Sequence, residues 1–209
     1  VEGTDLAAVR GNIISVTPAL PVNSLAELVA LAKAKPGQLS YASSGNGTST
    51  HLAAELFKAA AGIDIAHIPY KGSAPAVTDV IAGQVPVLVD SVASSTAQVK
   101  AGKLKALATT SSKRLLVLPE LATVAESGYL GFQSTAWVGL LAPAGTPKAI
   151  VEQINAAVLK VMALPETRER MAGFGAEITT STPDEFAAHI RSEMAKLGKV
   201  IRDANIKVN

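Results

Sequence analysis

Short apolar runs alternate with helical segments along the first half of this 209-residue chain. Helical periodicity and capping residues predict helices near residues 24–35, 50–61 and 94–101, and a further helix before Gly83. Apolar runs that fit strands fall near residues 39–42, 63–68, 85–89 and 104–109. Because strands that alternate with helices are joined by crossovers, the pattern predicts a mainly parallel sheet in an α/β fold.

The composition agrees with a buried sheet that is packed against helices. Hydrophobic residues make up 48% of the chain and aromatic residues only 4%, so most apolar side chains are alanine, valine, leucine and isoleucine. The 19 basic and 17 acidic residues give a net charge of +2 and form no basic stripe, which argues against nucleic acid as a partner. The absence of cysteine excludes a disulfide framework and a cysteine-ligated metal site.

The sequence gives two indications about targeting. No stretch approaches the roughly 20 apolar residues that a membrane span needs. The chain opens at Val1 without a charged and then apolar leader, so we expect that any signal peptide has already been removed. A chain without cysteine is compatible with export.

The second half of the chain contains fewer strand signals. Periodicity fades between residues 111 and 131, apart from a capping-box turn at 123–126, and returns with a strand at about 132–141. Thr146 is predicted as the N-cap of the next helix, with Pro147 at its first position. A capping box at 182–185 opens the last helix. One stripe of that helix is predicted to be buried, since its members recur at helical spacing: Phe186, Ile190, Met194, Leu197 and Ile201.

Motifs of common enzyme classes are missing from the sequence. It contains no G-x-S-x-G elbow, no H-E-x-x-H pair and no G-x-x-x-x-G-K-[ST] loop. His51, His67 and His189 lack the spacing of metal ligands, so we assign no catalytic residue, no metal ligand and no cofactor. One enzyme hypothesis stays open, in which a small α/β enzyme acts on a carboxylate through Asp90, His51 or Lys71.

A loop of small polar residues, 43–48, joins one predicted strand to the next helix. It offers hydroxyl groups and unpaired backbone N–H groups at the positive end of that helix, which is a place that attracts anions. Gly45 and Gly47 lack the third glycine of the dinucleotide fingerprint, which argues against a nucleotide site. The alternative is an ordinary turn whose serines cap a helix.

Two further segments follow predicted strands, where ligands bind in open α/β sheets. Tyr70 or Lys71 could donate to a carboxylate while Gly72 lets the backbone approach closely; the alternative is a packed tyrosine and a solvated lysine. Asp90 ends an apolar strand, and its burial without a partner would be costly. It either caps the next helix, pairs with a cation or receives a hydrogen bond from a ligand.

Longer motifs run through the chain in a fixed order. They are KAKPGQL at 33–39, YASSGNGTS at 41–49 followed by His51 and Leu52, PYKGSAPA at 69–76, IAGQV at 81–85, KAGKLKALA at 100–108, PE at 119–120, TVAESG at 123–128 and GLLAPAGTP at 139–147. In this order the chain resembles the substrate-binding proteins of tripartite tricarboxylate transporters, also called Bug receptors. The resemblance covers nearly the whole chain.

The resemblance implies the periplasmic binding protein-like architecture, with two α/β lobes and parallel-rich sheets. Such a periplasmic receptor captures a small mono- or dicarboxylate, or an amino acid, in the cleft between its lobes and presents it to a membrane permease without catalysis. A ligand-sensing module for a membrane signalling partner is a further alternative. The residues implied to face the cleft are Ser43, Ser44, Gly45, Gly47, Thr48, His51, Tyr70, Lys71, Gly72, Asp90, Ser134 and Thr135.

The chain departs from the family pattern at its start. Family members begin with a strand and a glycine-containing loop of the Pro-x-Gly-Gly type, and nothing in this sequence matches them. We therefore expect residues 1–15 to be a remnant of the first lobe and its first crossover, 16–131 to be a complete second lobe, and 132–209 to return to an incomplete first lobe with its C-terminal helices. Self-association through that incomplete lobe is a further expectation.

Overall fold

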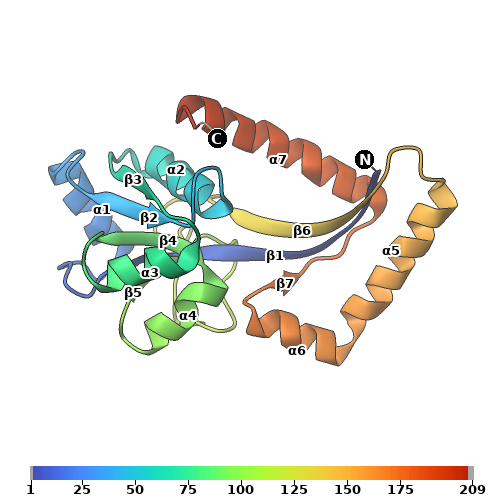
Figure 1. Ribbon diagram of the computed structural model, residues 1–209, viewed down its shortest axis with the longest axis horizontal. Coiled ribbons are helices and arrows are strands. Elements are labelled where there is room, and N and C mark those ends of the chain that lie inside the picture. Colours follow the sequence, from blue (N-terminus) through green and yellow to red (C-terminus); the bar gives the residue numbers. More distant parts are fainter. Residues whose placement is uncertain (1, 207–209) are drawn as a thin grey trace. The chain divides into compact units, whose positions relative to one another are not determined.

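The computed structural model describes residues 2–206, which fall into two compact units (Figure 1). Unit 1 contains the chain up to Arg10 together with Ala136–Lys199, and unit 2 contains Gly11–Thr135 together with the chain from Val200 onward. The first strand, β1 (Glu2–Val16), contributes residues to both units. The lobe boundaries expected after residues 15 and 131 stay a prediction.

Unit 1 combines the first part of β1 with two strands and three helices. They are β6 (Thr135–Ala142), α5 (Lys148–Ala163), α6 (Pro165–Gly173), β7 (Glu177–Ile178) and most of α7 (Pro183–Asp203). Ala8 of β1 pairs antiparallel with Ile178 of β7. Phe186 of α7 is fully buried and packs edge-on against Trp137, with ring centroids 5.6 Å apart. The only tryptophan of the chain is therefore a packing residue of this unit.

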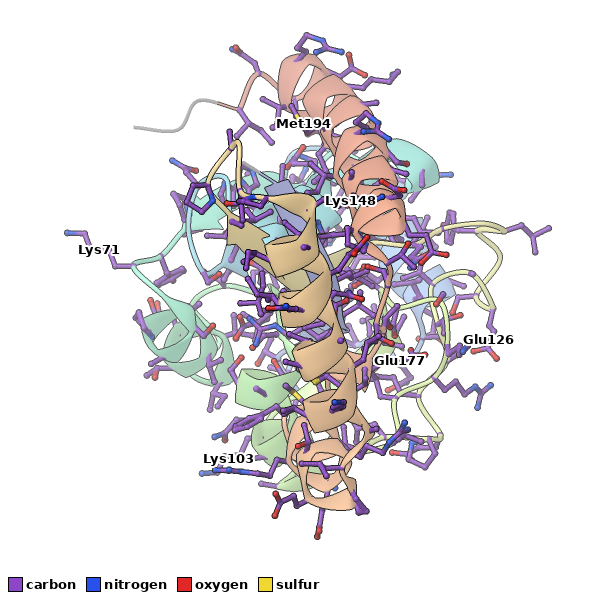
Figure 2. The ribbon with its side chains drawn as sticks, turned by 90° about the vertical axis from the view of Figure 1, so that its right-hand side faces the viewer. Lys71, Lys103, Glu126, Lys148, Glu177 and Met194 are labelled. Carbon is purple, nitrogen blue, oxygen red and sulfur yellow. The ribbon has the colours of Figure 1, made fainter. Side chains whose placement is uncertain are left out.

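Two expectations about the helices of unit 1 are wrong. The N-cap of α5 is Pro147, whose extended backbone precedes the helix, and the Thr146 hydroxyl instead donates to the carbonyl of Pro143 at 2.8 Å. The apolar stripe of α7 is not buried as a whole, because the helix packs closely only near its start. Among its described residues Phe186 alone is buried, whereas Met194 is 72% exposed (Figure 2).

Unit 2 alternates strands and helices in the order that the sequence predicts. Its further strands are β2 (Ser40–Ser43), β3 (Ala66–Pro69), β4 (Val87–Ser91) and β5 (Lys105–Thr109). Its helices are α1 (Leu25–Ala34), α2 (Ser49–Ala61), α3 (Ser73–Ile81) and α4 (Val92–Lys100). The α/β fold class is thereby confirmed.

The sheet of unit 2 has the strand order β3-β2-β4-β1-β5. Strand β2 is parallel to β3 and β4, whereas β1 is antiparallel to both β4 and β5. All strands of this sheet except β1 therefore point the same way, which confirms the parallel-rich sheet. The carboxyl ends of β2, β3, β4 and β5 lie at one edge as a result, and ligands of open α/β sheets bind at such an edge.

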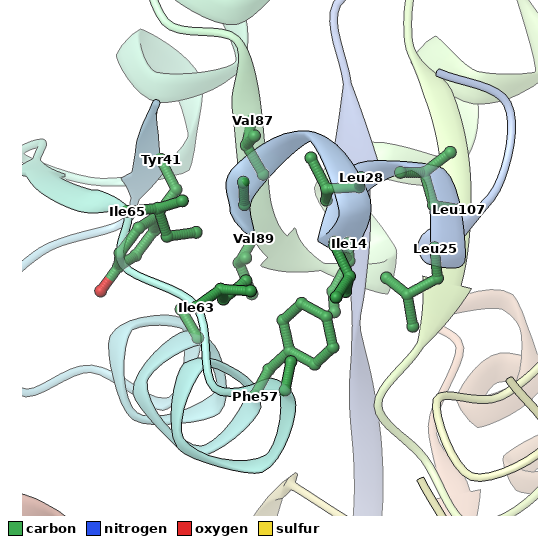
Figure 3. Packing of buried hydrophobic residues seen from close by; sticks show 14 of the residues in the cluster. Ile14, Leu25, Leu28, Tyr41, Phe57, Ile63, Ile65, Val87, Val89 and Leu107 are labelled. Carbon is green, nitrogen blue, oxygen red and sulfur yellow. The ribbon is translucent and has the colours of Figure 1, made fainter. Parts of the chain in front are cut away.

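One face of this sheet packs against α1 and α2 (Figure 3). Alternate residues of a strand point to the same face, so Tyr41 of β2, Val87 of β4 and Ile14 of β1 form one surface. Leu28 of α1 and Phe57 of α2 close over it and are 0% and 2% exposed. Full burial of such a side chain contributes about 1.5–3 kcal/mol, so this cluster is a main source of stability in the unit.

The opposite face packs against α3 and α4. Ala42 and Leu88, the strand neighbours of residues on the first face, point to this side and cluster with Val80 of α3. Ile13 lies on the same side of the sheet and clusters with Val92 of α4. Both faces of the sheet are therefore covered, which explains why its strands read as continuous apolar runs rather than as polar–apolar alternation.

The boundaries of several elements follow from local chemistry. Ser24 caps α1 by accepting the N–H of Glu27 at 3.2 Å. Gly62 ends α2 in the left-handed conformation, with φ of 61°. Thr123 and Glu126 exchange two hydrogen bonds between side chain and backbone, of 3.0 and 2.8 Å, so the predicted capping-box turn is confirmed.

Strand β1 is not predicted by the sequence. Residues 11–16 of this strand are all buried, so the run lacks the alternation that marks a half-buried strand. Its neighbours in the sheet of unit 2, β4 and β5, come from 71 residues or more later in the chain. No local signal reveals that residues 12–16 complete this sheet between two later strands.

We expect Gly139→Ala to destabilise unit 1. An added β-carbon would lie 2.7 Å from the carbonyl oxygen of Asp5 and would overlap the ring of Phe186, so the strand or the ring has to move. The expected loss in the free energy of unfolding is about 1–3 kcal/mol, measured by urea denaturation. Gly173→Ala is the matched control, because nothing lies within 4 Å of the added methyl group and alanine is the better helix former. Equal stability of the two variants would contradict this packing.

Candidate functional site

The candidate site lies at the edge of the unit 2 sheet where the parallel strands end. Ser43 is the last residue of β2, and Tyr70 directly follows β3. The carbonyl of Ser43 accepts the N–H of Tyr70 at 3.2 Å, and the carbonyl of Ser44 accepts the N–H of Gly72 at 3.1 Å. Two segments that the sequence singles out, the 43–48 loop and residues 70–72, are therefore joined by backbone hydrogen bonds.

The hydroxyl groups of the 43–48 loop mainly bind one another and the first turn of α2. The Thr48 hydroxyl donates to the carbonyl of Gly45 at 2.7 Å. The Thr50 hydroxyl lies 2.8 Å from that of Ser44 and 2.9 Å from that of Thr48. Thr48 also caps α2 by accepting the N–H of His51 at 3.4 Å. Because the hydroxyls are engaged in this network, the loop offers a ligand chiefly its backbone.

Three backbone N–H groups in the loop and the first turn of α2 have no acceptor within residues 2–206. They belong to Asn46, Ser49 and Thr50. The first N–H groups of a helix have no partner inside the helix and carry its positive partial charge. α2 has no acidic residue in its first turn to offset that charge. This end of α2 is therefore suited to an anion.

Asp90 lies at the amino ends of the next two helices. The residue is fully buried, and its Oδ1 and Oδ2 accept the hydroxyls of Ser73 and Ser94, both at 2.6 Å. Ser73 is the first residue of α3 and Ser94 belongs to the first turn of α4, so the carboxylate interacts with the positive ends of both helices. The chain thus supplies an anion to α3 and α4. Direct contact between Asp90 and a ligand stays a prediction.

Residues 70–72 present three different environments. The Tyr70 hydroxyl donates to Oδ2 of Asp79 at 2.7 Å, and burial together with this carboxylate raises the pKa of Tyr70 to about 12. Lys71 is exposed, and its side chain extends away from the ribbon (Figure 2). Gly72 has φ of 107°, which glycine adopts far more easily than other residues. A contact of any of these three residues with a ligand stays a prediction.

His51 lies beneath the 43–48 loop. It is 5% exposed, its Nδ1 accepts the N–H of Gly47 at 3.1 Å, and its ring stacks on that of His67 with centroids 3.8 Å apart. Nε2 of His67 lies 2.6 Å from the hydroxyl of Ser43, and the His67 ring also stacks on Tyr41 at 4.8 Å. Burial lowers the pKa of both histidines, that of His67 to about 4, so both are neutral at neutral pH.

Ser134 is hydrogen-bonded to Thr110, which follows β5. Ser134 and its neighbour Thr135 therefore lie at the same edge of the unit 2 sheet. The N–H of Ser134 donates to the carbonyl of Thr110 at 2.9 Å, and the Thr110 hydroxyl donates to the carbonyl of Ser134 at 2.6 Å. The Thr110 hydroxyl also accepts the N–H of Asn12 at 2.8 Å. The side-chain amide of Asn12 donates to the carbonyl of Ser49 at 3.4 Å. Asn12 and Thr110 are buried polar residues, and their position at the ends of apolar runs is the signal in the sequence that could have indicated them.

The described part of the chain shows neither a metal cluster nor a helix suited to a membrane. Within residues 2–206 no group of three histidine, aspartate or glutamate side chains is arranged to hold a metal ion. No helix in that range combines the length and the apolar character needed to cross a bilayer.

Fold and site together define a class of protein. Its marks are an α/β unit with a parallel-rich sheet, helix amino ends gathered at the carboxyl edge of that sheet, and a polar loop over one of them. This arrangement is that of the ligand-binding units of periplasmic binding proteins. The sequence profile of the tripartite tricarboxylate transporter family receptors matches residues 6–206. The chain belongs to this family.

A curated relative and two solved structures agree with this assignment. The UPF0065 protein in the tcbD-tcbE intergenic region of Pseudomonas sp. (strain P51) is 37% identical over 205 residues, which are 98% of this chain and 61% of that protein. The chain thus spans about three fifths of the length of this relative. The structure of R. palustris Rpa4515 with adipate has a TM-score of 0.86 at 35% identity and covers 98% of this chain and 69% of its own. MatC (Rpa3494) from Rhodopseudomonas palustris with bound malate has a TM-score of 0.80 at 27% identity and covers 95% and 69%.

We expect Gly45→Ala to loosen the contact between the 43–48 loop and residues 70–72. Gly45 has φ of 137°, and an added β-carbon would lie 3.0 Å from the carbonyl oxygen of Tyr70. Strain and clash together disfavour the present loop conformation by about 1–3 kcal/mol. The amide hydrogens of Tyr70 and Gly72 should therefore exchange faster with solvent, which native-state hydrogen exchange measures.

The control for this prediction is Gly62→Ala. Gly62 has φ of 61° with nothing within 4 Å of an added β-carbon, and it ends α2 away from the loop. This variant should lower the free energy of unfolding by about 1 kcal/mol without a selective effect on the amides of Tyr70 and Gly72. If both variants change the exchange of these two amides equally, the loop is not coupled to residues 70–72 as described.

Proposed function

We propose that the chain is a solute-binding receptor of a tripartite tricarboxylate-type transporter and that it captures a small carboxylate at the 43–48 loop. One observation carries the proposal. Three helices, α2, α3 and α4, begin at the same edge of the sheet. Within residues 2–206, the Asp90 carboxylate accepts hydrogen bonds at the amino ends of α3 and α4, whereas no carboxylate of the chain does so at the amino end of α2. An external anion at α2 would give all three helix ends a negatively charged partner.

The backbone N–H donors at the amino end of α2 are suited to a carboxylate. A carboxylate has two oxygens that accept hydrogen bonds, and the N–H groups of Asn46, Ser49 and Thr50 need acceptors. Hydrogen bonds to an ionised acceptor are roughly twice as strong as neutral ones, and the helix end adds about 0.3–1 kcal/mol, or more in a partly buried site. The adipate of Rpa4515 and the malate of MatC are both dicarboxylates, which supports the same ligand class for this chain.

The proposed binding surface of unit 2 has a backbone centre and a polar rim. Its centre is the loop with Gly45 and Gly47, whose φ angles of 137° and 71° are ones that glycine adopts most easily. The rim is formed by residues 70–72 and by Ser134 and Thr135, which the sequence suggested. The buried residues Asn12 and Thr110 support this rim from within the unit. Asp90 and His51 act in this proposal from below the surface.

The enzyme alternative has less support. The family is one of receptors. Asp90 and His51 are buried, and both oxygens of Asp90 and Nδ1 of His51 accept hydrogen bonds from the chain, so neither group is presented to a bound acid. Lys71 is exposed, and its side chain extends away from the ribbon rather than toward a buried pocket (Figure 2).

The proposed partners follow from the family. We propose that the receptor is periplasmic and delivers its ligand to the membrane permease of the transporter. A ligand-sensing module for a membrane signalling partner would use the same binding surface. The two differ in the membrane protein that co-purifies with the loaded receptor.

We expect calorimetric titration to show that the chain binds adipate or malate and does not bind adipamide, the neutral diamide of adipate. The reason is that the site is built for negative charge. Ser49→Asp places a carboxylate in the first turn of α2, so it should stabilise the fold by about 0.3–1 kcal/mol and weaken adipate binding at least about tenfold. Ser49→Asn is the control of equal size without charge. Equal affinities of these two variants, or equal binding of acid and diamide, would overturn the proposal.

A second proposal concerns association of the chain with itself. Unit 1 has an apolar groove of about 540 Å³ between β1, β6, α5 and α6. Phe174 and Val161 line it and are 60% and 50% exposed, and Val138 on β6 is 59% exposed. Exposed apolar surface of this kind marks an interaction site. We propose that a second copy of the chain covers it, in keeping with the expectation from the sequence.

The oligomeric state tests this second proposal. We expect a concentration-dependent dimer in sedimentation velocity, because burial of these side chains in a shared interface favours association. Phe174→Asp should shift the equilibrium to monomer, since a charge in the groove would be desolvated on association. Leu116→Asp is the control, because Leu116 is 86% exposed but lies in unit 2. A monomer at high micromolar concentration, or an equal effect of both substitutions, would exclude the proposal.

A further inference from the structure

Two stacked imidazole rings lie directly beneath the 43–48 loop and hold it by hydrogen bonds from below. We propose that His51 is a positioning residue for this loop and that protonation of the His51–His67 pair in acid releases the loop and weakens anion binding. The inference rests on the proposed function, because the loop is the proposed anion site. It adds a pH-dependent control of that site.

The first argument is the hydrogen bond between His51 and the loop. Nδ1 of His51 accepts the N–H of Gly47 at 3.1 Å, so this nitrogen carries no hydrogen. Nε2 then carries the hydrogen and faces Oε1 of Glu55 at 4.0 Å. Protonation adds a hydrogen to Nδ1 and places it against the N–H of Gly47. Two donors cannot bind each other, so the loop has to move.

The second argument is the position of the two rings. The His51 and His67 rings are stacked with centroids 3.8 Å apart and an angle of 19° between their planes. A positive charge on both rings at this distance is unfavourable, because like charges repel strongly in a partly buried site. His67 also reaches the loop, since its Nε2 lies 2.6 Å from the Ser43 hydroxyl, which in turn accepts the N–H of Gly45. Repulsion between the charged rings would therefore act on both ends of the loop.

The titratable and charged groups around the two rings come from three elements. Glu55 and Lys58 lie on α2 with His51, His67 lies on β3, and Tyr41 lies on β2. Glu55 favours a charge on the rings, but its Oε1 already accepts the Tyr41 hydroxyl at 2.6 Å and the Lys58 ammonium at 2.8 Å. Lys58 opposes a charge on either ring.

Burial is the largest influence on both rings and lowers the pKa of each. A lowered pKa means that the folded state prefers the neutral rings. The hydrogen bond to Gly47 is therefore intact above the pKa of His51 and is lost as the pH falls through it. The pKa of His67 is lowered to about 4, so this ring stays neutral in mild acid.

The first test needs no ligand. In an NMR titration of the full chain, the amide resonance of Gly47 should shift with the same midpoint as the ring resonances of His51. In His51→Asn the side-chain oxygen takes the place of Nδ1 as an acceptor, and the Gly47 amide should no longer follow the pH. A Gly47 amide that ignores the titration of His51 in the unmodified chain would overturn the inference.

The second test measures adipate affinity at about pH 7.5 and about pH 4.5. We expect the unmodified chain to lose about three- to tenfold more affinity in acid than His51→Asn, since the titration of adipate itself is common to both. His51→Phe, which has no acceptor, should bind weakly at both values, and His51→Asn should recover most of that loss. His189→Asn, which removes a ring that packs on Trp137 in unit 1, should behave as the unmodified chain.

The outcomes separate the two proposals. If no variant binds adipate or malate at about pH 7.5, the proposed function fails, while the Gly47 amide still reports on the positioning role of His51. If adipate binds but His51→Asn keeps the full pH dependence of the unmodified chain, the inference fails and the proposed function stands. Weak binding of His51→Phe without recovery in His51→Asn also overturns the positioning role.

Discussion

All strands of the unit 2 sheet except β1 point the same way, and most of the chemistry of this unit depends on that constraint. A parallel strand must be followed by a crossover, so α2, α3 and α4 each begin where a strand has just ended. Their positive ends and unpaired N–H groups are thereby brought to one edge. Hydrophobic burial on both faces maintains this geometry, since α1 and α2 cover one face while α3 and α4 cover the other.

The three helix ends differ in how their positive charge is met. A buried carboxylate is costly unless it is hydrogen-bonded, and Asp90 satisfies this requirement with two hydroxyls from two helices. These two hydrogen bonds stabilise the positions of α3 and α4. The first turn of α2 is surrounded by neutral hydroxyls and by a neutral histidine, so its charge stays available. Within residues 2–206, the chain thus provides its own anion to α3 and α4 but none to the first turn of α2, where an external anion can bind.

The loop over α2 is coupled to the core beneath it. Tyr41 belongs to the main apolar cluster of the unit, and its cross-strand neighbour is His67, on which it stacks. His67 stacks on His51, and His51 holds Gly47. A chain of contacts therefore runs from the packed face of the sheet to the proposed binding surface. This coupling gives the loop a fixed shape and also makes that shape sensitive to the charge of two imidazoles.

The sequence by itself determined the class of fold, the order of the elements from α1 to β5 and the loop that most resembles an anion site. These features have local causes, namely apolar periodicity, capping residues such as Ser24, and glycines that end helices. Tertiary structure alone decided the position of β1, the joining of Asn12 and Thr110 to the site, and the placement of His51 below the loop rather than on it. Each of these depends on residues far apart in the chain. Pairings of that kind leave no periodic signal, because they arise only when the sheet is assembled.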